Sequence, residues 1–300
     1  MNTSSTGTPV RPSRKKGMVR AFAGSLPALG AMVLLGLIVL LAIFAPYFAP
    51  QNPYDLTQLN ILDGNLPPGA QSMDGMTYLL GTDDQGRDML SAILYGLRTS
   101  LAVGVGSAFI AAILGTVIGL VAANAGGRTE SVIMRLVDLQ LSFPSILAAL
   151  MILAFLGQGV ANVVIALVVV EWATYARVAR SAALVERNKE YIEAAECLAL
   201  PFVRVLFGHL LPNCLPPLIV IATVQVARAI ALEATLSFLG LGVPITQPSL
   251  GLLISNGYQY MLTGTYWLSL YPGIALFITV ASINMVGDRL RNLFNPRNSA

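Results

Sequence analysis

Residues 190–213 read EYIEAAECLALPFVRVLFGHLLPN, a polar stretch between two strongly apolar parts of the chain. Its first half, around Glu190 and Glu193, consists mainly of good helix formers. Pro201 fits the first turn of a second short helix, where its missing N–H costs nothing. That helix carries an apolar stripe of Phe202, Val205, Leu206 and Leu210. The stretch therefore predicts two short helices joined by a sharp turn, a segment that we call the elbow.

The composition of the whole chain indicates a membrane protein. Hydrophobic residues make up 55% of the 300 residues and charged residues 11%, whereas soluble domains have about 25% charged residues. A helix needs about 20 apolar residues to cross the hydrocarbon layer. Runs near this length lie at 28–49, 100–123, 132–156, 160–182, 214–239 and 267–286. We therefore predict an all-α integral membrane protein with six transmembrane helices.

Basic residues set the predicted orientation of these helices. The N-terminal tail has Arg11, Arg14, Lys15, Lys16 and Arg20 without an acidic residue, and basic flanks stay in the cytoplasm. The first run is too long for the apolar region of a signal peptide, so it is expected to remain as a helix. Six crossings then leave both termini inside (N-in/C-in) and place the elbow in the cytoplasm.

These assignments divide the chain into five predicted segments. They are a disordered cytoplasmic tail at 1–25, a first transmembrane helix at 26–50, an extracytoplasmic loop at 51–98, a core at 99–287 that holds the cytoplasmic loop 185–212, and a cytoplasmic tail at 288–300. Within 51–98, the spacing of Leu90, Ile93, Leu94 and Leu97 predicts a helix lying flat at the membrane interface.

Three local patterns predict details of the packing. The spacing of Gly115 and Gly119 allows two membrane helices to approach closely. Pro144 is expected to bend the third run. The aspartates of the outer loop lack the ligand alternation of a calcium-binding loop, so turn and cap roles are expected for Asp55, Asp63, Asp74, Asp83, Asp84 and Asp88.

Several motifs together resemble one family of transport proteins. Within the elbow, Glu193-Ala194-Ala195, position 199 and Leu211-Pro212 match the spacing of the EAA loop of bacterial ABC importer permeases. The chain is similar to the C-type permeases of dipeptide, oligopeptide and nickel importers also at 81–88, at 134–138 with Phe143-Pro144, at 236–242, at 271–273 and at 287–291.

The resemblance implies a type I ABC importer permease fold in the bacterial inner membrane. It implies a second homologous permease, two cytoplasmic ATPases, an extracytoplasmic substrate-binding protein and a peptide substrate, besides the membrane lipid. ATP and magnesium would be bound by the ATPases, so this non-catalytic chain would hold no cofactor or metal. Consistently, none of its lysines is followed by the Ser or Thr of a phosphate-binding loop, and no basic stripe interleaved with aromatics suggests nucleic acid.

In that family the elbow couples the permease to its ATPases. The corresponding residues here are Glu193, Ala194, Ala195, Ala199, Leu200, Pro201, Phe202, Arg204, Val205, Leu211 and Pro212. Ala199 stands where the family usually has glycine, which turns easily with positive φ. We therefore expect a turn that alanine can adopt, set instead by Pro201.

Charged residues inside the apolar runs leave alternatives open, because a charge at the bilayer centre is costly. Arg177 and Arg180 are expected to extend toward the cytoplasmic surface. The deeper Glu171, Arg228 and Glu233 would either form ion pairs that lock helices, including pairs across the two permeases, or line the pathway and contact the charged ends of a peptide. A permease for nickel chelates or glutathione, or a proton-coupled transporter using Asp138, Glu171 or Glu233, are the alternative functions.

Overall fold

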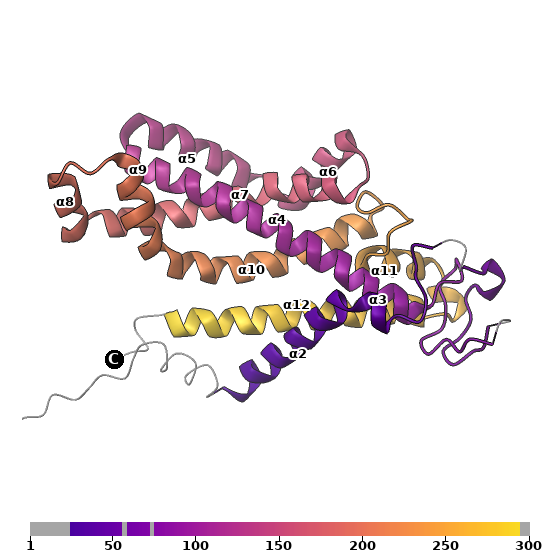
Figure 1. The fold of residues 1–300 in the computed structure, drawn as a ribbon. Coiled ribbons are helices and arrows are strands. Elements are labelled where there is room, and N and C mark those ends of the chain that lie inside the picture. The colour runs from indigo at the N-terminus through magenta and orange to yellow at the C-terminus, as the bar shows by residue number, and fades with distance from the viewer. Residues whose placement is uncertain (1–24, 56–58, 73–74, 295–300) are drawn as a thin grey trace, which may run out of the picture.

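The computed structural model describes residues 25–55, 59–72 and 75–294. Most of them form an elongated helical bundle with the elbow at one end and the outer loop at the other (Figure 1). The elements are α2 (Leu26–Ile43), α3 (Ala45–Phe48), the 3-10 helix η2 (Ile61–Asp63), α4 (Met89–Ala125), α5 (Gly127–Ser142), α6 (Ser145–Leu156), α7 (Val160–Arg187), α8 (Glu190–Cys197), α9 (Phe202–Arg204), the π-helix η3 (Val205–Leu210), α10 (Leu211–Phe238), α11 (Leu250–Gln259), the 3-10 helix η4 (Met261–Thr263) and α12 (Trp267–Phe294). Residues 1–24 and 295–300, which make up most of the predicted tails at 1–25 and 288–300, lie outside the described residues, and so does Asp74.

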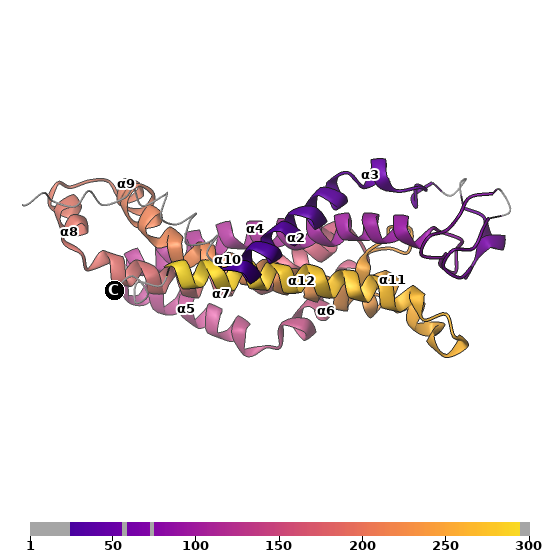
Figure 2. The ribbon, with the colours of Figure 1, turned by 90° about the horizontal axis from the view of Figure 1, so that it is seen from below.

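The predicted crossings correspond to long apolar helices. In the part of the chain that the structure describes, five helices are long and apolar enough to cross a membrane: α2, α4, α7, α12 and the continuous stretch Phe202–Phe238. The third predicted crossing consists of α5 and α6, which meet at 91° (Figure 2). Phe143 and Pro144 between them have extended ψ angles of 140° and 123°. The bend predicted at Pro144 is therefore confirmed, and the pair would supply the sixth span.

The prediction of a separate interfacial helix is wrong. Residues 90–97 belong to α4, which runs without a break for 37 residues from Met89 to Ala125. Ile93 and Leu97 are buried in a cluster with Leu250, Leu253 and Trp267. The apolar spacing therefore reflects packing against α11 and α12, which one sequence segment cannot distinguish from an interfacial face.

The Gly115–Gly119 pattern marks the close contact between α4 and α7. A Cβ atom added to Gly115 would lie 2.3 Å from the backbone oxygen of Trp172, and one added to Gly119 would lie 2.3 Å from that of Ala176. Neither position has room for a side chain. The prediction that small residues bring two helices together is confirmed.

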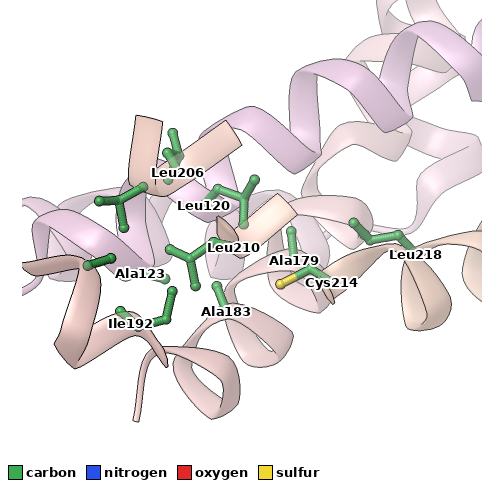
Figure 3. Packing of buried hydrophobic residues seen from close by; sticks show 11 residues of the cluster. Leu120, Ala123, Ala179, Ala183, Ile192, Leu206, Leu210, Cys214 and Leu218 are labelled. Carbon is green, nitrogen blue, oxygen red and sulfur yellow. The ribbon is translucent and has the colours of Figure 1, made fainter. Parts of the chain in front are cut away.

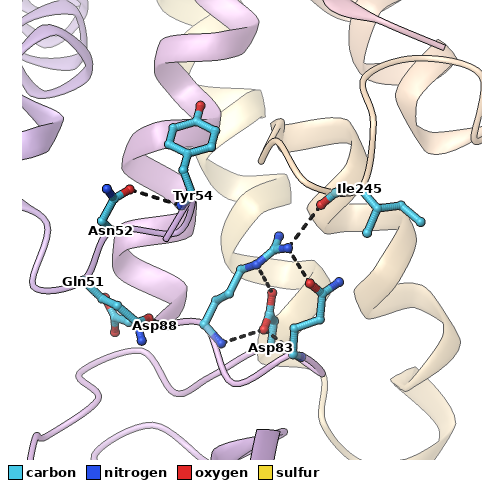
Figure 4. Close-up of polar contacts among 8 residues, drawn as sticks. Gln51, Asn52, Tyr54, Asp83, Asp88 and Ile245 are labelled. Atoms are coloured by element: carbon cyan, nitrogen blue, oxygen red, sulfur yellow. Dashed lines mark hydrogen bonds and ion pairs between the residues drawn. The ribbon is translucent and has the colours of Figure 1, made fainter. Parts of the chain in front are cut away.

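Asp83 and Asp88 of the outer loop make a turn and a cap, as predicted, whereas the carboxylate of Asp63 accepts from the side chains of Ser72 and Tyr78 instead. Asp83 accepts hydrogen bonds through Oδ1 from the backbone nitrogens of Gln85, at 2.9 Å, and Arg87, at 2.8 Å. Asp88 caps α4 by accepting from the backbone nitrogen of Ser91 at 2.8 Å. The buried guanidinium of Arg87 donates to the backbone oxygen of Ile245 at 3.2 Å and so joins this loop to the segment after α10 (Figure 4).

Candidate functional site

The elbow has the predicted first helix and turn, but its second helix is not a separate short one, because α9 and η3 continue without a break into α10. The elbow is anchored to the bundle by its inner face. Ile192 and Ala195 of α8 and Val205, Leu206 and Leu210 of η3 are buried. They pack against residues of α4, α7 and α10 (Figure 3), namely Leu120, Ala123, Ala179, Ala183, Cys214 and Leu218. Burial of apolar area stabilises such a contact by about 25 cal/mol per Å². The elbow is therefore held against three spanning helices rather than hanging as a free loop.

Polar contacts fix the junction between α7 and α8. Glu186 accepts from Lys189 Nζ at 2.6 Å and from the Tyr191 hydroxyl at 2.7 Å. Arg187 donates to the backbone oxygen of Ala123 at 3.0 Å and so ties the end of α7 to α4. Burial, together with the hydrogen bond to Glu186, raises the pKa of Tyr191 to about 12. The phenol therefore stays protonated and able to donate at physiological pH.

The turn of the elbow departs from what the sequence predicted. Ala199 has φ +51°, in the left-handed region that glycine adopts readily. Alanine thus takes the conformation of the missing glycine, rather than a turn set by Pro201. Pro201 has φ −61° and ψ 143° and lies at the N-cap of α9, one residue before the predicted first turn. An L-residue in the left-handed region costs about 1–2 kcal/mol, and the packed inner face offsets this cost.

The predicted coupling residues divide into an exposed and a buried set. The exposed ones are Glu193, Ala194, Ala199, Pro201, Phe202, Arg204 and Pro212. Ala195 and Val205 are buried, and Leu200 and Leu211 pack partly buried against the same cluster. The predicted apolar stripe is corrected at Phe202, which is 48% exposed. The reason is that the i→i+5 turns of the π-helix η3 are wider than α-helical turns and place 205, 206 and 210 on the buried side.

Sequence reasoning missed three exposed apolar residues of the elbow. Leu198 is 74% exposed, Val203 63% and Phe207 44%. With Phe202 they form a set that we call the exposed apolar residues of the elbow. A usable signal was present in the sequence, because these are the apolar residues left over once a single buried stripe has been assigned. Outside the hydrocarbon layer such a concentration of apolar side chains marks an interaction surface.

Two arginines of α7 pair with acidic residues of α5. Arg177 Nη2 lies 2.5 Å from Asp138 Oδ1, and Arg180 Nε donates to Glu130 Oε1 at 2.7 Å. These partners were not predicted, because they depend on how α5 folds back beside α7. The extension of Arg177 and Arg180 toward the cytoplasmic surface stays a prediction.

Within the described residues, the deeper charges Glu171, Arg228 and Glu233 make no ion pair with one another. Ion pairs of these residues with a second permease stay a prediction. Glu233 is fully buried and accepts at 2.7 Å from both Ser100 and Ser237. Arg228 donates to the Ser145 hydroxyl at 2.9 Å. Glu233 thus serves as an internal anchor, whereas Glu171 and Arg228 line one small cavity.

Comparison with known proteins gives consistent matches over most of the chain. Residues 115–300 match the family model described as binding-protein-dependent transport system inner membrane component. Residues 14–68 match the N-terminal TM domain of oligopeptide transport permease C. The chain is 38% identical over 288 residues to the di/tripeptide transport system permease protein DppC of Pseudomonas aeruginosa, covering 96% of this chain and 94% of that protein.

More distant matches agree. The oligopeptide transport system permease protein OppC of Bacillus subtilis is 34% identical over 283 residues, which cover 94% of this chain and 89% of that protein. Among solved structures, the inward-facing MetNI methionine ABC transporter superposes with a TM-score of 0.56 at 23% identity, over 68% of this chain and 97% of that one. This likeness shows a shared fold.

Proposed function

The chain belongs to the family of binding-protein-dependent transport system inner membrane components, and on that premise we propose that it is a permease subunit of an ATP-driven importer of di- and oligopeptides. It is a multi-pass protein of the inner membrane. The peptide substrate is supported by relatives of 33–38% identity whose names specify di-, tri- or oligopeptide transport. A non-catalytic role for this subunit follows from the family.

The geometry of the elbow supports the proposal that separate ATPases drive this subunit. It lies at one end of the bundle (Figure 1), its inner face is packed, and its outer side presents apolar residues such as Leu198 and Phe202. A partner seated on these residues would be linked mechanically to α4, α7 and α10 through one contiguous apolar cluster. Movement of the partner would therefore be transmitted to the spanning helices.

The remaining partners follow from the same proposal. A second homologous permease would complete the pathway, and two ATPases, which bind ATP and magnesium, would dock on the elbows in the cytoplasm. A substrate-binding protein would deliver the peptide at the opposite end, where Arg87 holds the outer loop against the segment after α10. The N-in/C-in orientation belongs to this proposal and is supported by the basic N-terminal tail.

Loss of ATPase binding tests the elbow directly. Phe202→Asp or Leu198→Asp places a charge among the exposed apolar residues without touching the buried cluster. We expect at least a tenfold weaker association with the ATPases, since one interface anchor can contribute 2 kcal/mol or more. The quantity measured is the amount of ATPase that copurifies with the permease in detergent.

The matched control is Leu262→Asp, which adds the same charge at a fully exposed leucine in η4, near the opposite end. This variant should retain its ATPases. Full ATPase recovery with both elbow variants would refute the docking role. The charge changes Glu193→Lys and Ala199→Asp are expected to leave the subunit in the membrane but to uncouple ATP hydrolysis from uptake.

A further inference from the structure

A small polar cavity lies at the bend between α5 and α6. Its walls come from these two helices and from α7 and α10, and its volume is about 50 Å³. The polar side chains that line it are Gln140, Ser145, Glu171, Thr174, Gln225 and Arg228. A water molecule occupies about 30 Å³ in the liquid. The cavity therefore accepts the end of a small molecule but not a whole peptide.

Two buried side chains face this cavity with unused hydrogen-bonding capacity. Glu171 and Gln225 are each only 2% exposed. Neither carboxylate oxygen of Glu171 has a hydrogen-bond partner among the described residues, and the same holds for Nε2 of Gln225. Buried polar groups are normally paired, and an unpaired carboxylate is especially costly. An unused acceptor and an unused donor thus lie at one site without the bonds that a purely structural role would give them.

The contrast with Glu233 shows that this fold can satisfy a buried carboxylate. Glu233 accepts from Ser100 and Ser237, each at 2.7 Å. No hydroxyl group donates to Glu171 in this way, although Thr174 lines the same cavity. Arg228, which is exposed and donates to Ser145, adds a positive charge at the cavity.

We propose that this cavity receives the amino-terminal end of the peptide during passage, with its α-ammonium group on Glu171 and its first carbonyl oxygen on the amide of Gln225 and the guanidinium of Arg228. This inference rests on the proposed function and deepens it. The amino terminus of a peptide carries three ammonium donors next to one carbonyl acceptor. The cavity offers the complementary set, with carboxylate acceptors on α7 and two donors on α10.

The charges at the cavity favour this ligand over a metal ion. Hard cations such as magnesium and calcium require six or more oxygen ligands, whereas the cavity offers one carboxylate and is lined by a guanidinium. A peptide end with an ammonium group followed by a carbonyl group can bind the carboxylate and the guanidinium at the same time. Charge-assisted hydrogen bonds of this kind are stronger than neutral ones, and the small volume restricts the site to the end of the chain.

The test uses the purified complex of both permeases and both ATPases, without the binding protein. Its melting temperature is measured with L-alanyl-L-alanine and with N-propionyl-L-alanine, which has the same skeleton but lacks the amino group. A ligand that binds the folded state raises the melting temperature. We expect a larger rise with alanyl-alanine, and a ten- to hundredfold weaker affinity for it in Glu171→Gln.

Glu233→Gln is the matched control, because it also removes a buried carboxylate but at a site that is already hydrogen-bonded. It should keep the peptide-dependent shift. Because Glu171→Gln replaces an unpaired carboxylate with a neutral isostere, we expect its melting temperature without peptide to equal or exceed that of the wild type. A reduced ligand-free melting temperature would assign Glu171 a structural role and overturn the inference.

Three other results would also overturn it: no shift in the wild type, equal shifts with the two ligands, or an unchanged shift in Glu171→Gln. Uptake of alanyl-alanine into proteoliposomes by the same wild-type complex, supplied with its binding protein and ATP, separates the two proposals. Uptake without a peptide-specific shift would leave the importer function standing and refute only the cavity. Failure of uptake would count against the importer function itself.

Discussion

The close contact between α4 and α7 predicts that single methyl groups on α4 weaken the fold in a position-dependent way. In Gly115→Ala the new Cβ would lie 2.3 Å from the backbone oxygen of Trp172 and 2.6 Å from the Cβ of Tyr175. A normal carbon–oxygen contact is over 3 Å, and neither neighbour is the flexible end of a side chain. The two helices must therefore separate by roughly 1 Å, and overpacking of this kind costs about 1–3 kcal/mol.

A matched control isolates this cost from the effect of alanine on the helix. Alanine in place of glycine favours a helix by up to about 1 kcal/mol. Gly106→Ala makes the same exchange on the same helix, where nothing lies within 4 Å of the added Cβ. The propensity gain cancels between the two variants, so Gly115→Ala should be less stable than Gly106→Ala by about 1–3 kcal/mol.

Thermal unfolding of the purified protein in detergent, followed by intrinsic fluorescence, measures the difference. At about 2–4 °C per kcal/mol for a chain of this size, Gly115→Ala should melt about 2–12 °C below Gly106→Ala. Gly119→Ala should behave like Gly115→Ala, since its Cβ would lie 2.3 Å from the backbone oxygen of Ala176. Equal melting temperatures for all three variants would refute the close contact of α4 with α7.

Three further predictions concern the elbow, the outer loop and the α5–α7 pairing. Ala199→Gly relieves a left-handed alanine, worth about 1–2 kcal/mol, but adds about 0.4–1 kcal/mol of unfolded-state entropy; we expect a slightly higher melting temperature, and a clear decrease would contradict the turn geometry. Burial raises the pKa of Asp83 to about 6 from 3.8 despite Arg87 beside it, with Asp84 adding to the rise. The folded state therefore binds more protons than the unfolded state between about pH 4 and 6, and stability should fall as pH rises through that window; the melting temperature of Asp83→Asn should lack this component, and parallel pH curves for the two proteins would exclude it. Arg180→Met removes the partner of Glu130, which is largely buried, and should lower the melting temperature more than Arg177→Met, whose ion pair with Asp138 is half exposed and contributes about 0–1 kcal/mol; the reverse order would refute this ranking.

Much of the fold could be predicted from local sequence because the bilayer restricts what an apolar run can do. A run near 20 residues must be helical to satisfy its own backbone, so α2, α7 and α12 follow from composition alone. Pro144 is likewise a local signal, since proline removes a backbone hydrogen bond and tends to kink or break a helix. The first helix of the elbow and the start of the second near Pro201 follow from their immediate neighbours, whereas the length of the second helix, which continues into α10, does not.

Errors arose where one pattern fits two environments. Leu90, Ile93, Leu94 and Leu97 have the spacing of an interfacial helix and of a buried helix face, and only contact with Leu250 and Trp267 distinguishes the two. The left-handed Ala199 is another such case, because the packing of the elbow on α4, α7 and α10 overrides the preference of alanine. The partners of Arg177 and Arg180 likewise depend on how α5 folds back beside α7.

That this chain is a helical membrane protein with an elbow between two apolar runs follows from its residues alone, since both properties depend on the solvent and on neighbouring residues. The roles of the buried charges, in contrast, depend on how the helices pack. Glu171 and Glu233 are both glutamates in apolar helices, although Ser237 lies one turn after Glu233. Hydroxyl groups of Ser237 and of Ser100, 133 residues away, satisfy Glu233, while Glu171 faces a cavity without a partner. A partner such as Ser100 comes from a distant part of the chain, so its identity is fixed by how the helices pack.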